Sequence, residues 1–271
     1  MTGAWYILAG LALFVIWVTW RVRVSGCGLQ AWFLHWVARV YTRVMFHLKA
    51  GNERTIPEND PAIIIANHTS PVDPMLMWAD HCGSFKSPKI RLPGFMTAKE
   101  YCELGGIVGW ICKVMESIPV ARHGRDMTPA KNALRRLKDS ELVGVFPEGK
   151  INDVAPDKQL IPGDTGAAWL ALKSRVPVIP VYIHSAPRGK SMVGSFLVRT
   201  HSTLYYGQPI DISRWYDQRL TQEILREVTD EMMLRLAELG GVKPPPPVAP
   251  GPFLPTGPPP IEDKPEADSE G

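Results

Sequence analysis

The chain has 271 residues, of which 45% are apolar and 21% are charged, and its formal net charge is +3. These values are typical of a globular protein with enough apolar residues for a core, and the length fits one catalytic domain with appended segments. A nucleic-acid-binding domain would concentrate its basic residues in a stripe, but here they are scattered, which argues against that class. The four cysteines form no CxxC pair and no metal-like spacing, so we expect reduced cytosolic thiols.

The first predicted element is an uncharged run over residues 4–20, AWYILAGLALFVIWVTW. As a helix it would span about 26 Å, close to the ~30 Å hydrocarbon core of a bilayer, so we expect a membrane anchor. A signal peptide is the alternative, but the run lacks a basic start and a small-residue cleavage site. A helix that is inserted into only one leaflet of the bilayer is a further alternative. Arg21 and Arg23 follow the run, and the positive-inside tendency predicts a cell-membrane protein whose catalytic domain faces the cytoplasm.

The next segment, residues 29–49, interleaves apolar and aromatic residues with Arg39, Arg43 and Lys49. This pattern is typical of an amphipathic helix at a lipid surface. The alternative is a helix that packs on the domain core. The preceding anchor favours the membrane, so residues 1–50 are assigned to a membrane-associated segment.

Residues 51–242 are expected to form one catalytic domain with an α/β fold, in which helices flank a mostly parallel sheet. From about residue 60, short β-branched runs alternate with helical stretches. The predicted strands are Ala62–Ala66, Phe95–Ala98, Ser117–Val120, Leu142–Phe146 and Val178–Ile183, with one or two more between residues 196 and 206. The predicted helices cover about residues 72–82, 106–115, 128–139, 165–174 and 219–239. The last of them is expected to end at Gly240-Gly241 and carries one apolar stripe, which consists of Leu220, Ile224, Val228, Met232 and Leu236.

The composition changes sharply at the C-terminal end, where residues 243–271 read KPPPPVAPGPFLPTGPPPIEDKPEADSEG. A segment this rich in proline cannot bury much apolar surface and predicts an extended, disordered tail. Docking through a proline motif is the less favoured alternative.

A histidine and an aspartate follow the first predicted strand, within the sequence NHTSPVD over residues 67–73. Ser70 is expected to cap a helix, with Asp73 in a capping-box position. A carboxylate one turn from His68 can accept a hydrogen bond from one ring nitrogen and leave the other free to take a proton, as in a catalytic triad. His-x4-Asp is a common pattern, and the alternative is that Asp73 is only a helix cap.

A second motif, FPEG over residues 146–149, ends the apolar run LVGVF. The carboxyl ends of parallel strands meet at one edge of a sheet, where α/β proteins bind ligands. We therefore expect both motifs at the same edge. Such a turn exposes backbone N–H groups to an anionic or polyol ligand, and a plain surface turn is the alternative.

Four blocks occur in order along the chain: NHTSPVD, a segment ending in SIPVAR, FPEG and VPVIPV. In this order the sequence resembles the glycerolipid acyltransferases, the family that includes 1-acyl-sn-glycerol-3-phosphate acyltransferases. The resemblance implies that His68 is the base that activates the acceptor hydroxyl and that Asp73 is its partner. It implies that Arg122 holds the phosphate of the acceptor, and that Glu148 and Gly149 bind its glycerol portion. The fourth block is expected to be structural.

The sequence departs from the family pattern around the third block. Lys150, Ile151 and Asn152 follow Gly149 where many members have Thr and then Arg, and Asp164 occupies a place where a basic residue is frequent. These changes alter the charge near the expected head-group pocket, so the resemblance supports acyl transfer more firmly than it supports a lysophosphatidate acceptor. Lys99 can supply a compensating positive charge, and Lys150 is a further candidate for substrate binding.

The expected reaction moves a fatty acyl group from acyl-CoA or acyl carrier protein to the hydroxyl of 1-acyl-sn-glycerol-3-phosphate or a related lysophospholipid, in phospholipid biosynthesis. We expect no cofactor and no metal, because the chain contains no HExxH motif or cysteine cluster. An acyl-thioester or lipid hydrolase is one alternative, although no GxSxG nucleophile elbow occurs. A non-catalytic lipid-binding scaffold is the other, and it would not need His68 and Asp73 together. The expected partners are the acyl donor, the lysophospholipid and the membrane, and not nucleic acid.

Overall fold

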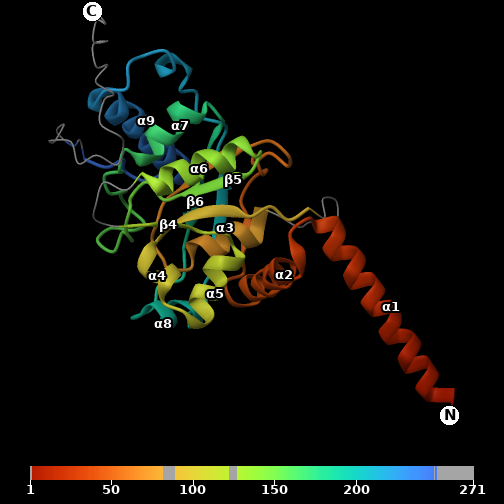
Figure 1. The fold of residues 1–271 in the computed structure, drawn as a ribbon. Coiled ribbons are helices and arrows are strands. Elements are labelled where there is room, and N and C mark those ends of the chain that lie inside the picture. Colours follow the sequence, from red (N-terminus) through yellow and green to blue (C-terminus); the bar gives the residue numbers. More distant parts are fainter. Residues whose placement is uncertain (1, 82–88, 122–126, 247, 249–271) are drawn as a thin grey trace, which may run out of the picture.

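The computed structural model describes residues 2–81, 89–121, 127–246 and 248 (Figure 1). Its centre is a sheet whose strands, in the described part of the chain, follow the order β1-β7-β6-β2-β5-β3-β4. Neighbouring strands run parallel except β6 and β7, which are antiparallel. The prediction of a mostly parallel α/β fold is therefore confirmed. The strands are β1 Lys49–Ala50, β2 Ala62–Ala66, β3 Pro93–Ala98, β4 Ile118–Val120, β5 Leu142–Val145, β6 Val178–His184 and β7 Thr203–Tyr206.

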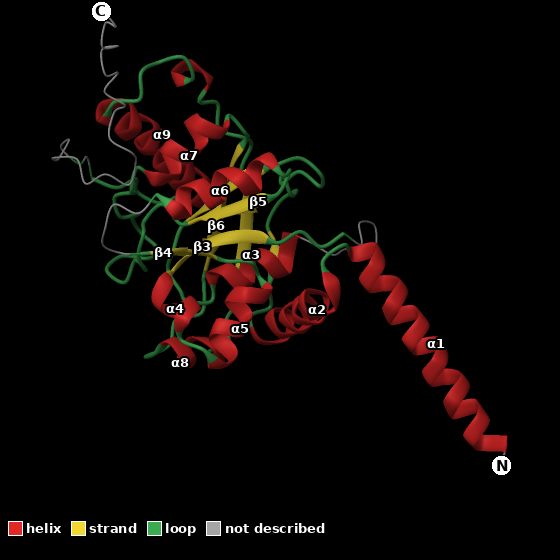
Figure 2. Ribbon diagram, in the orientation of Figure 1, coloured by secondary structure: helices red, strands yellow, loops and turns green. Residues whose placement is uncertain are grey.

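Helices cover both faces of this sheet (Figure 2). Side chains alternate along β2, so that Ile64 packs into one apolar cluster and Ile63 and Ile65 pack into another. The first cluster is covered by α2 and α3, with contributions from α5 and α8, and the second by α6, α7 and α9. The helices are α1 Thr2–Ser25, α2 Gly28–Met45, α3 Asp73–His81, α4 Lys99–Glu103, α5 Gly106–Val114, α6 Thr128–Lys138, α7 Gly166–Ser174, α8 Met192–Leu197 and α9 Gln222–Gly240, and a 3-10 turn spans Ser213–Trp215.

Helix α1 projects away from the body of the domain (Figure 1). Within it, Ala4–Ser25 is long and apolar enough to cross a membrane, with a mean hydropathy of 1.8. Its apolar 18-residue stretch is unburied, whereas Arg21 and Ser25 near its end are buried against the domain. Helix length and composition thus agree with the anchor expected for residues 4–20. The helix extends farther than the uncharged run because Arg21 and Arg23 continue it.

Helix α2 packs on the domain with a side that mixes apolar and polar residues, and most of the side chains that it exposes are apolar. Its buried residues include His35, Arg39 and Thr42, and Arg39 donates to the carbonyl oxygen of Ala79 in α3 at 2.8 Å. The sequence grouped Arg39 with Arg43 and Lys49 as the cations of an amphipathic helix, but Arg39 is buried and its guanidinium satisfies a backbone carbonyl of the neighbouring helix. The apolar side chains that point outward are Leu29, Phe33, Val37, Val40 and Val44.

The region predicted as late strands contains one strand and one helix. Residues Met192–Leu197 form α8, which begins where the Ser191 hydroxyl accepts a hydrogen bond from the N–H of Gly194. Only the last two residues of this helix, Phe196 and Leu197, fall within the region predicted as late strands. Only Thr203–Tyr206 pairs, as β7, with β6. The short elements β1 and α4 were not predicted.

The last helix ends as expected, at a glycine. Gly241 has φ of +62°, the left-handed conformation that glycine adopts without strain. The buried residues of α9 include Val228, Met232 and Leu236 of the predicted stripe. Beyond the helix, Lys243 still contacts the domain, because it pairs with the loop at Lys158–Leu160.

Candidate active site

The two sequence motifs lie side by side at the carboxyl edge of the sheet. Strands β2 and β5 are parallel neighbours, with Ile65 opposite Val145, so the residues that follow them leave the sheet together. Asn67 extends the edge by one step, because its side-chain amide exchanges two hydrogen bonds with the backbone of Ile183 in β6. His68 is the first residue past this pairing.

His68 and Asp73 form the hydrogen bond that the motif predicts. Nδ1 of His68 lies 3.0 Å from Oδ2 of Asp73, whose side chain is completely buried, while the His68 side chain is 18% exposed. The same oxygen accepts the backbone N–H groups of Thr69 and Ser70 at 2.7 and 2.8 Å. Three donors hold this carboxylate in one orientation, and Nε2 is left as the ring nitrogen away from Asp73.

The turn that carries these residues forms because of local capping. Ser70 donates its N–H to Asp73, and its hydroxyl accepts from the N–H of Val72 at 3.2 Å. This is the reciprocal arrangement of a capping box, and α3 then begins at Asp73. Asp73 therefore has both roles that the sequence left open: it caps the helix and contacts the imidazole.

Phe146 supports the imidazole from one side. Its ring stacks on that of His68, with ring centroids 4.3 Å apart and an interplanar angle of 23°, and Phe95 stacks behind it at 5.8 Å. No role for this phenylalanine was predicted from the sequence. Its position as the last apolar residue before the turn was the only available signal.

Glu148 binds the backbone that carries His68. One of its oxygens accepts the N–H of His68 at 2.8 Å, and the other accepts the N–H of Ile161 at 3.1 Å. The residue is 4% exposed. Burial raises the pKa of this carboxyl, and the two backbone hydrogen bonds lower it in part. With both oxygens engaged, the geometry favours a positioning role over the glycerol contact that the resemblance implies.

Asn152 holds the backbone of His68 at its carbonyl group, on the other side of the α-carbon from the N–H that Glu148 binds. Its backbone N–H donates to the carbonyl oxygen of His68 at 2.7 Å. Its buried side chain donates to the carbonyl oxygen of Gln159 at 2.8 Å and accepts the N–H of Ala155 at 3.3 Å. Sequence reasoning noted Asn152 only as a departure from the family pattern, because an asparagine in a turn carries no signal of so distant a contact.

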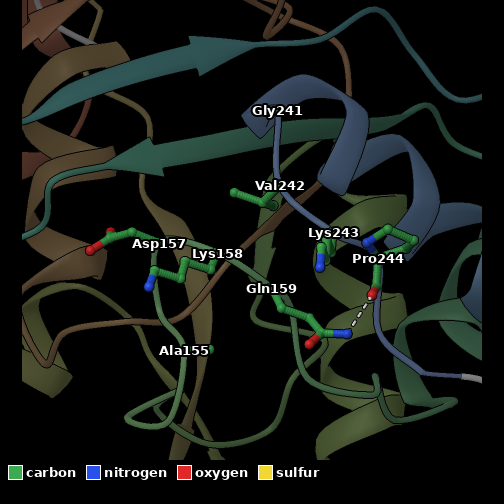
Figure 3. A pocket seen from close by; sticks show the side chains of 8 residues that line it. All are labelled: Ala155, Asp157, Lys158, Gln159, Gly241, Val242, Lys243 and Pro244. Carbon is green, nitrogen blue, oxygen red and sulfur yellow. Dashed lines mark hydrogen bonds between the residues drawn. The ribbon is translucent and has the colours of Figure 1, made fainter.

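The segment after α9 reinforces this loop (Figure 3). Leu160 donates its N–H to the carbonyl oxygen of Lys243 at 3.0 Å, and Lys243 donates to that of Lys158 at 2.9 Å. Gln159 reaches the carbonyl oxygen of Pro244 at 3.2 Å. Lys158, Gln159, Lys243 and Pro244 are among the residues that line a pocket of about 750 Å³ on the surface of the loop. The C-terminal strap, defined as Val242–Pro244, thereby connects to the residues that bind the backbone of His68.

A second pocket, of about 430 Å³, lies beside the FPEG turn. Glu148, Gly149, Lys150 and Asp164 line it together with Ile161 and Pro162, whereas His68 does not. Gly149 has φ of +66°, and a Cβ placed on it would lie 2.5 Å from the carboxylate of Asp164. The predicted residues Gly149 and Lys150 are thus brought together around a pocket that is lined by both acidic and basic side chains.

A further predicted cation, Lys99, is paired on its own helix. Lys99 begins α4 at the end of β3, on the same sheet edge, and its ammonium lies 3.4 Å from Glu103 on the same helix. Arg122 lies outside the described residues. Within residues 2–81, 89–121, 127–246 and 248, no group of three or more His, Cys, Asp or Glu residues could hold a metal ion.

The residues at this edge of the sheet fall within a segment that matches a known protein family. The family model described as Acyltransferase matches residues 47–184, just over half of the chain, which includes both motifs. The chain is 30% identical over 135 residues to an N-acylphosphatidylethanolamine synthase of Arabidopsis thaliana and 26% identical over 167 residues to an uncharacterized acyltransferase of Schizosaccharomyces pombe. These matches cover 49% and 59% of this chain but only 46% and 56% of those relatives.

Two further similarities cover more of the known protein. A 1-acyl-sn-glycerol-3-phosphate acyltransferase of Bacillus subtilis is 22% identical over 201 residues, which are 73% of this chain and 92% of that one. The crystal structure of a 1-acyl-sn-glycerophosphate acyltransferase from Thermotoga maritima matches with a TM-score of 0.55 and 19% identity, over 89% of this chain and 97% of that one, and shares the fold. The family match over the residues that carry His68, Asp73 and Glu148 shows that the chain belongs to the Acyltransferase family.

Proposed function

We propose that this chain transfers a fatty acyl group from acyl-CoA or acyl carrier protein to the hydroxyl of 1-acyl-sn-glycerol-3-phosphate or a related lysophospholipid, with His68 as the general base. The observation that carries the proposal is the hydrogen bond between Nδ1 of His68 and the buried carboxylate of Asp73. A neutral imidazole held in this way can accept a proton at Nε2.

The proposed reaction needs no covalent acyl-enzyme. Nε2 of His68 takes the proton of the acceptor hydroxyl while the oxygen attacks the thioester carbonyl carbon, which forms the new C–O bond. Collapse of the tetrahedral intermediate breaks the C–S bond, and the imidazolium returns its proton to the leaving thiolate. Asp73 accepts from Nδ1–H and stabilises the imidazolium between these two steps.

The surrounding residues receive roles that follow from their positions. Glu148 fixes the backbone of His68, and Gly149 and Lys150 contribute the pocket beside it to the polar head of the acceptor. Arg122 is proposed, from its motif alone, to bind the phosphate. Lys99 adds a positive charge at the same edge of the sheet, and its ammonium group also pairs with Glu103.

The proposal includes a membrane location and a division of the chain. We place α1 in the cell membrane and the domain on its cytoplasmic side, because Arg21 and Arg23 follow the apolar run and the first acidic residue is Glu53. Residues 1–50 are then the membrane segment, 51–242 the acyltransferase domain and 243–271 the proline-rich tail. A lipid acceptor and a water-soluble acyl donor meet at such a boundary.

A second candidate acceptor is the amine of phosphatidylethanolamine. The Arabidopsis relative, which is 30% identical over 135 residues, is named for N-acylation of this lipid. Asp164 lines the pocket beside Gly149, and an acid there suits an ammonium group better than a phosphate. The same base would deprotonate the amine before it attacks the thioester.

The test measures thiol release from palmitoyl-CoA by detergent-purified protein with lysophosphatidate, with phosphatidylethanolamine, or without lipid. Wild type is compared with His68→Ala and with His201→Ala, a matched control at an exposed histidine. Lipid-dependent release that falls at least about 10²-fold in His68→Ala but not in His201→Ala is expected of a general base.

The other outcomes separate the alternatives. Release that does not need lipid would indicate a thioesterase. Release only with phosphatidylethanolamine would select the second candidate. If no thiol is released from palmitoyl-CoA or from palmitoyl-carrier protein with any of these lipids, the catalytic proposal fails in favour of a non-catalytic scaffold.

A further inference from the structure

The α4–α5 hairpin brings two cysteine side chains together beside the active site. It follows β3, a parallel neighbour of β5, so it begins at the sheet edge that carries His68. Helices α4 and α5 contact each other (Figure 2). A Cβ placed on Gly109 of α5 would lie 3.3 Å from the carbonyl oxygen of Cys102 in α4, so this glycine allows a close approach of the two helices. Cys112 lies three residues after Gly109 and therefore on the side of α5 that faces Cys102.

The thiols of Cys102 and Cys112 form a hydrogen bond with each other, and both are reduced and half-buried. A reduced cysteine is usually a small apolar residue of a protein core. Neither α4 nor α5 contains a buried residue, so core packing does not explain this pair. Two thiols in contact near the surface can form a disulfide, and disulfides in cytosolic proteins are typically transient and redox-sensing.

The proton of Cys102 determines which thiol reacts first. Burial, then the charge and the hydrogen bond of Cys112, and then the charge of Glu103 raise the pKa of Cys102 to about 12. Cys102 therefore keeps its proton at neutral pH, and Cys112 is the thiol that attacks first, because the thiolate is the nucleophile. Once Cys112 is bonded to another sulfur it carries no charge. Its contributions to the pKa of Cys102 are then lost, and Cys102 becomes able to react second.

A bond between the two sulfurs would move α4 more than α5. Helix α5 is held from both sides, because Ile111 packs against the apolar cluster under α2 and α3, and Ser117 donates its N–H to the carbonyl oxygen of Cys112 at 2.9 Å. Helix α4 has five residues, none of them buried. Lys99 lies three residues before Cys102 and thus on the same side of α4, so a displacement of Cys102 also displaces this ammonium group.

We propose that Cys102 and Cys112 are a redox site that reacts with low-molecular-weight disulfides, such as glutathione disulfide, and forms an intramolecular disulfide that draws α4 towards α5. The Cys112 thiolate attacks one sulfur of the small disulfide, whose S–S bond breaks, and one thiolate leaves. The Cys102 thiolate then attacks the Cys112 sulfur of the mixed disulfide and releases the second small thiol. Two cysteine thiols are thereby oxidised to one disulfide, and the small disulfide is reduced to two thiols.

The disulfide weakens the binding of the acceptor, because it moves Lys99 away from the sheet edge at which the polar head of the acceptor binds. This consequence rests on the proposed function, in which Lys99 adds a positive charge at that edge. The redox reaction itself does not depend on that function.

The reaction is tested without turnover, on the full chain in detergent. Cys27→Ser and Cys82→Ser leave Cys102 and Cys112 as the remaining thiols. The protein is incubated with glutathione disulfide, its remaining thiols are alkylated, and the intact chain and its peptides are analysed by mass spectrometry. A chain that has lost two hydrogens, with linked peptides at 102 and 112 and reversal by dithiothreitol, is expected. A stable glutathione adduct on Cys112, a disulfide between two chains, or full alkylation at both positions would overturn the proposal.

Three further variants in the same background test the order of attack and the geometry. Cys102→Ser should stop at the mixed disulfide on Cys112, and Cys112→Ser should react at least about tenfold more slowly than the pair. The matched control combines Cys112→Ser with Lys113→Cys, which moves the thiol one position along α5 to an exposed site. It should carry a glutathione adduct and no intramolecular bond. A bond between positions 102 and 113 that forms as fast as that between 102 and 112 would overturn the assignment of a specific pair.

The effect on the acceptor is measured with reduced and oxidised protein. Oxidation is expected to raise the KM for lysophosphatidate about fivefold, the size of an exposed charge interaction, and to leave kcat unchanged. Lys99→Gln should have a raised KM in the reduced form that oxidation does not raise further. Equal KM values for the oxidised and reduced pair would overturn the effect on the acceptor. Absence of any transfer by the reduced protein would contradict the proposed function, whereas the disulfide, which is measured without turnover, would stand.

Discussion

Oε1 of Glu148 accepts the backbone N–H of His68 at 2.8 Å, although the two residues lie 80 positions apart in the sequence. Oε2 of the same carboxylate accepts the N–H of Ile161 at 3.1 Å. Glu148 thus joins the strand end that carries the imidazole to the loop that follows the FPEG turn. Its removal should disturb the placement of the ring more than the binding of the acceptor.

The substitution Glu148→Ala is expected to lower kcat by about 10- to 100-fold, because a small displacement of a catalytic group is costly. The KM for the acceptor should stay within about threefold of wild type, because the substitution removes no interaction that binds the acceptor equally in the ground state and the transition state. Glu148→Gln keeps one acceptor oxygen and should restore part of kcat. Steady-state kinetics with varied lysophospholipid measure both parameters.

The matched control is Glu223→Ala, which removes an exposed glutamate in the first turn of α9 and should change neither parameter. If Glu148→Ala instead raises KM and leaves kcat intact, Glu148 binds the substrate directly, as the family resemblance implies.

The raised pKa of Glu148 predicts how stability changes with pH. Burial is the main cause, and the ordinary value is 4.5. Above this pH the unfolded chain releases the proton while the folded chain retains it, so the contribution of the protonated form to stability is fully present below 4.5 and is lost as pH rises through the folded pKa. The free energy of unfolding of wild type relative to Glu148→Gln should therefore fall over this window. Chemical denaturation at a series of pH values measures the difference.

Glu223 provides a control of opposite sign. Hydrogen bonds from its own backbone N–H and from the Thr221 hydroxyl lower its pKa. Its contribution is present above 4.5 and is lost as pH falls through the folded pKa. Parallel pH dependences of Glu148→Gln and Glu223→Gln, each relative to wild type, would contradict the expected role of burial at Glu148.

The substitution Asp73→Asn should reduce kcat by about 10²- to 10⁴-fold, the range expected when an imidazole base loses its orienting carboxylate. The amide also offers an N–H₂ group to a position where Thr69 and Ser70 already donate, so a lower melting temperature should accompany the loss. Thiol-release kinetics and thermal denaturation test the two effects. Asp217→Asn, at an exposed aspartate, serves as the control. Retention of full activity in Asp73→Asn would restrict Asp73 to the role of helix cap.

Gly149→Ala should destabilise the protein by about 1–2 kcal/mol, the cost of placing a side chain in the left-handed conformation. The φ of Gly149 is +66°, and its new methyl group would also meet the carboxylate of Asp164 at 2.5 Å. Gly166→Ala is the matched control, because that glycine has no such φ and has open space around the added carbon. Equal unfolding free energies for the two variants in denaturant would argue against strain at the FPEG turn.

The sequence allowed good prediction where local rules determine the structure. The predicted strand Ala62–Ala66 has the observed bounds, and the capping box placed Asp73 beside His68. The sequence failed where distant partners decide the outcome. Asn152 reaches His68 only after the loop folds back, and no local pattern marks that contact. The apolar period of α2 was visible, but which side would be buried depends on α3 and on the medium outside the domain.

The C-terminal strap is expected to contribute to catalysis although it contacts no reacting atom. Its backbone pairs with Lys158 and Leu160, and the same loop supplies the Gln159 carbonyl that holds Asn152 and the Ile161 N–H that holds Glu148. A chain that ends after residue 246 should retain wild-type kcat.

A chain that ends after residue 241 lacks the strap and should show kcat lowered by about tenfold, since the groups that bind the His68 backbone lose their support. Lys243→Ala is the matched control, because the strap pairs through backbone atoms that alanine retains. Circular dichroism establishes that the shortened chains fold before thiol release is measured. Equal kcat for the chains that end at 241 and 246 would show that the loop holds Asn152 and Glu148 without the strap. A loss in Lys243→Ala as large as in the shorter chain would assign the effect to the ammonium group.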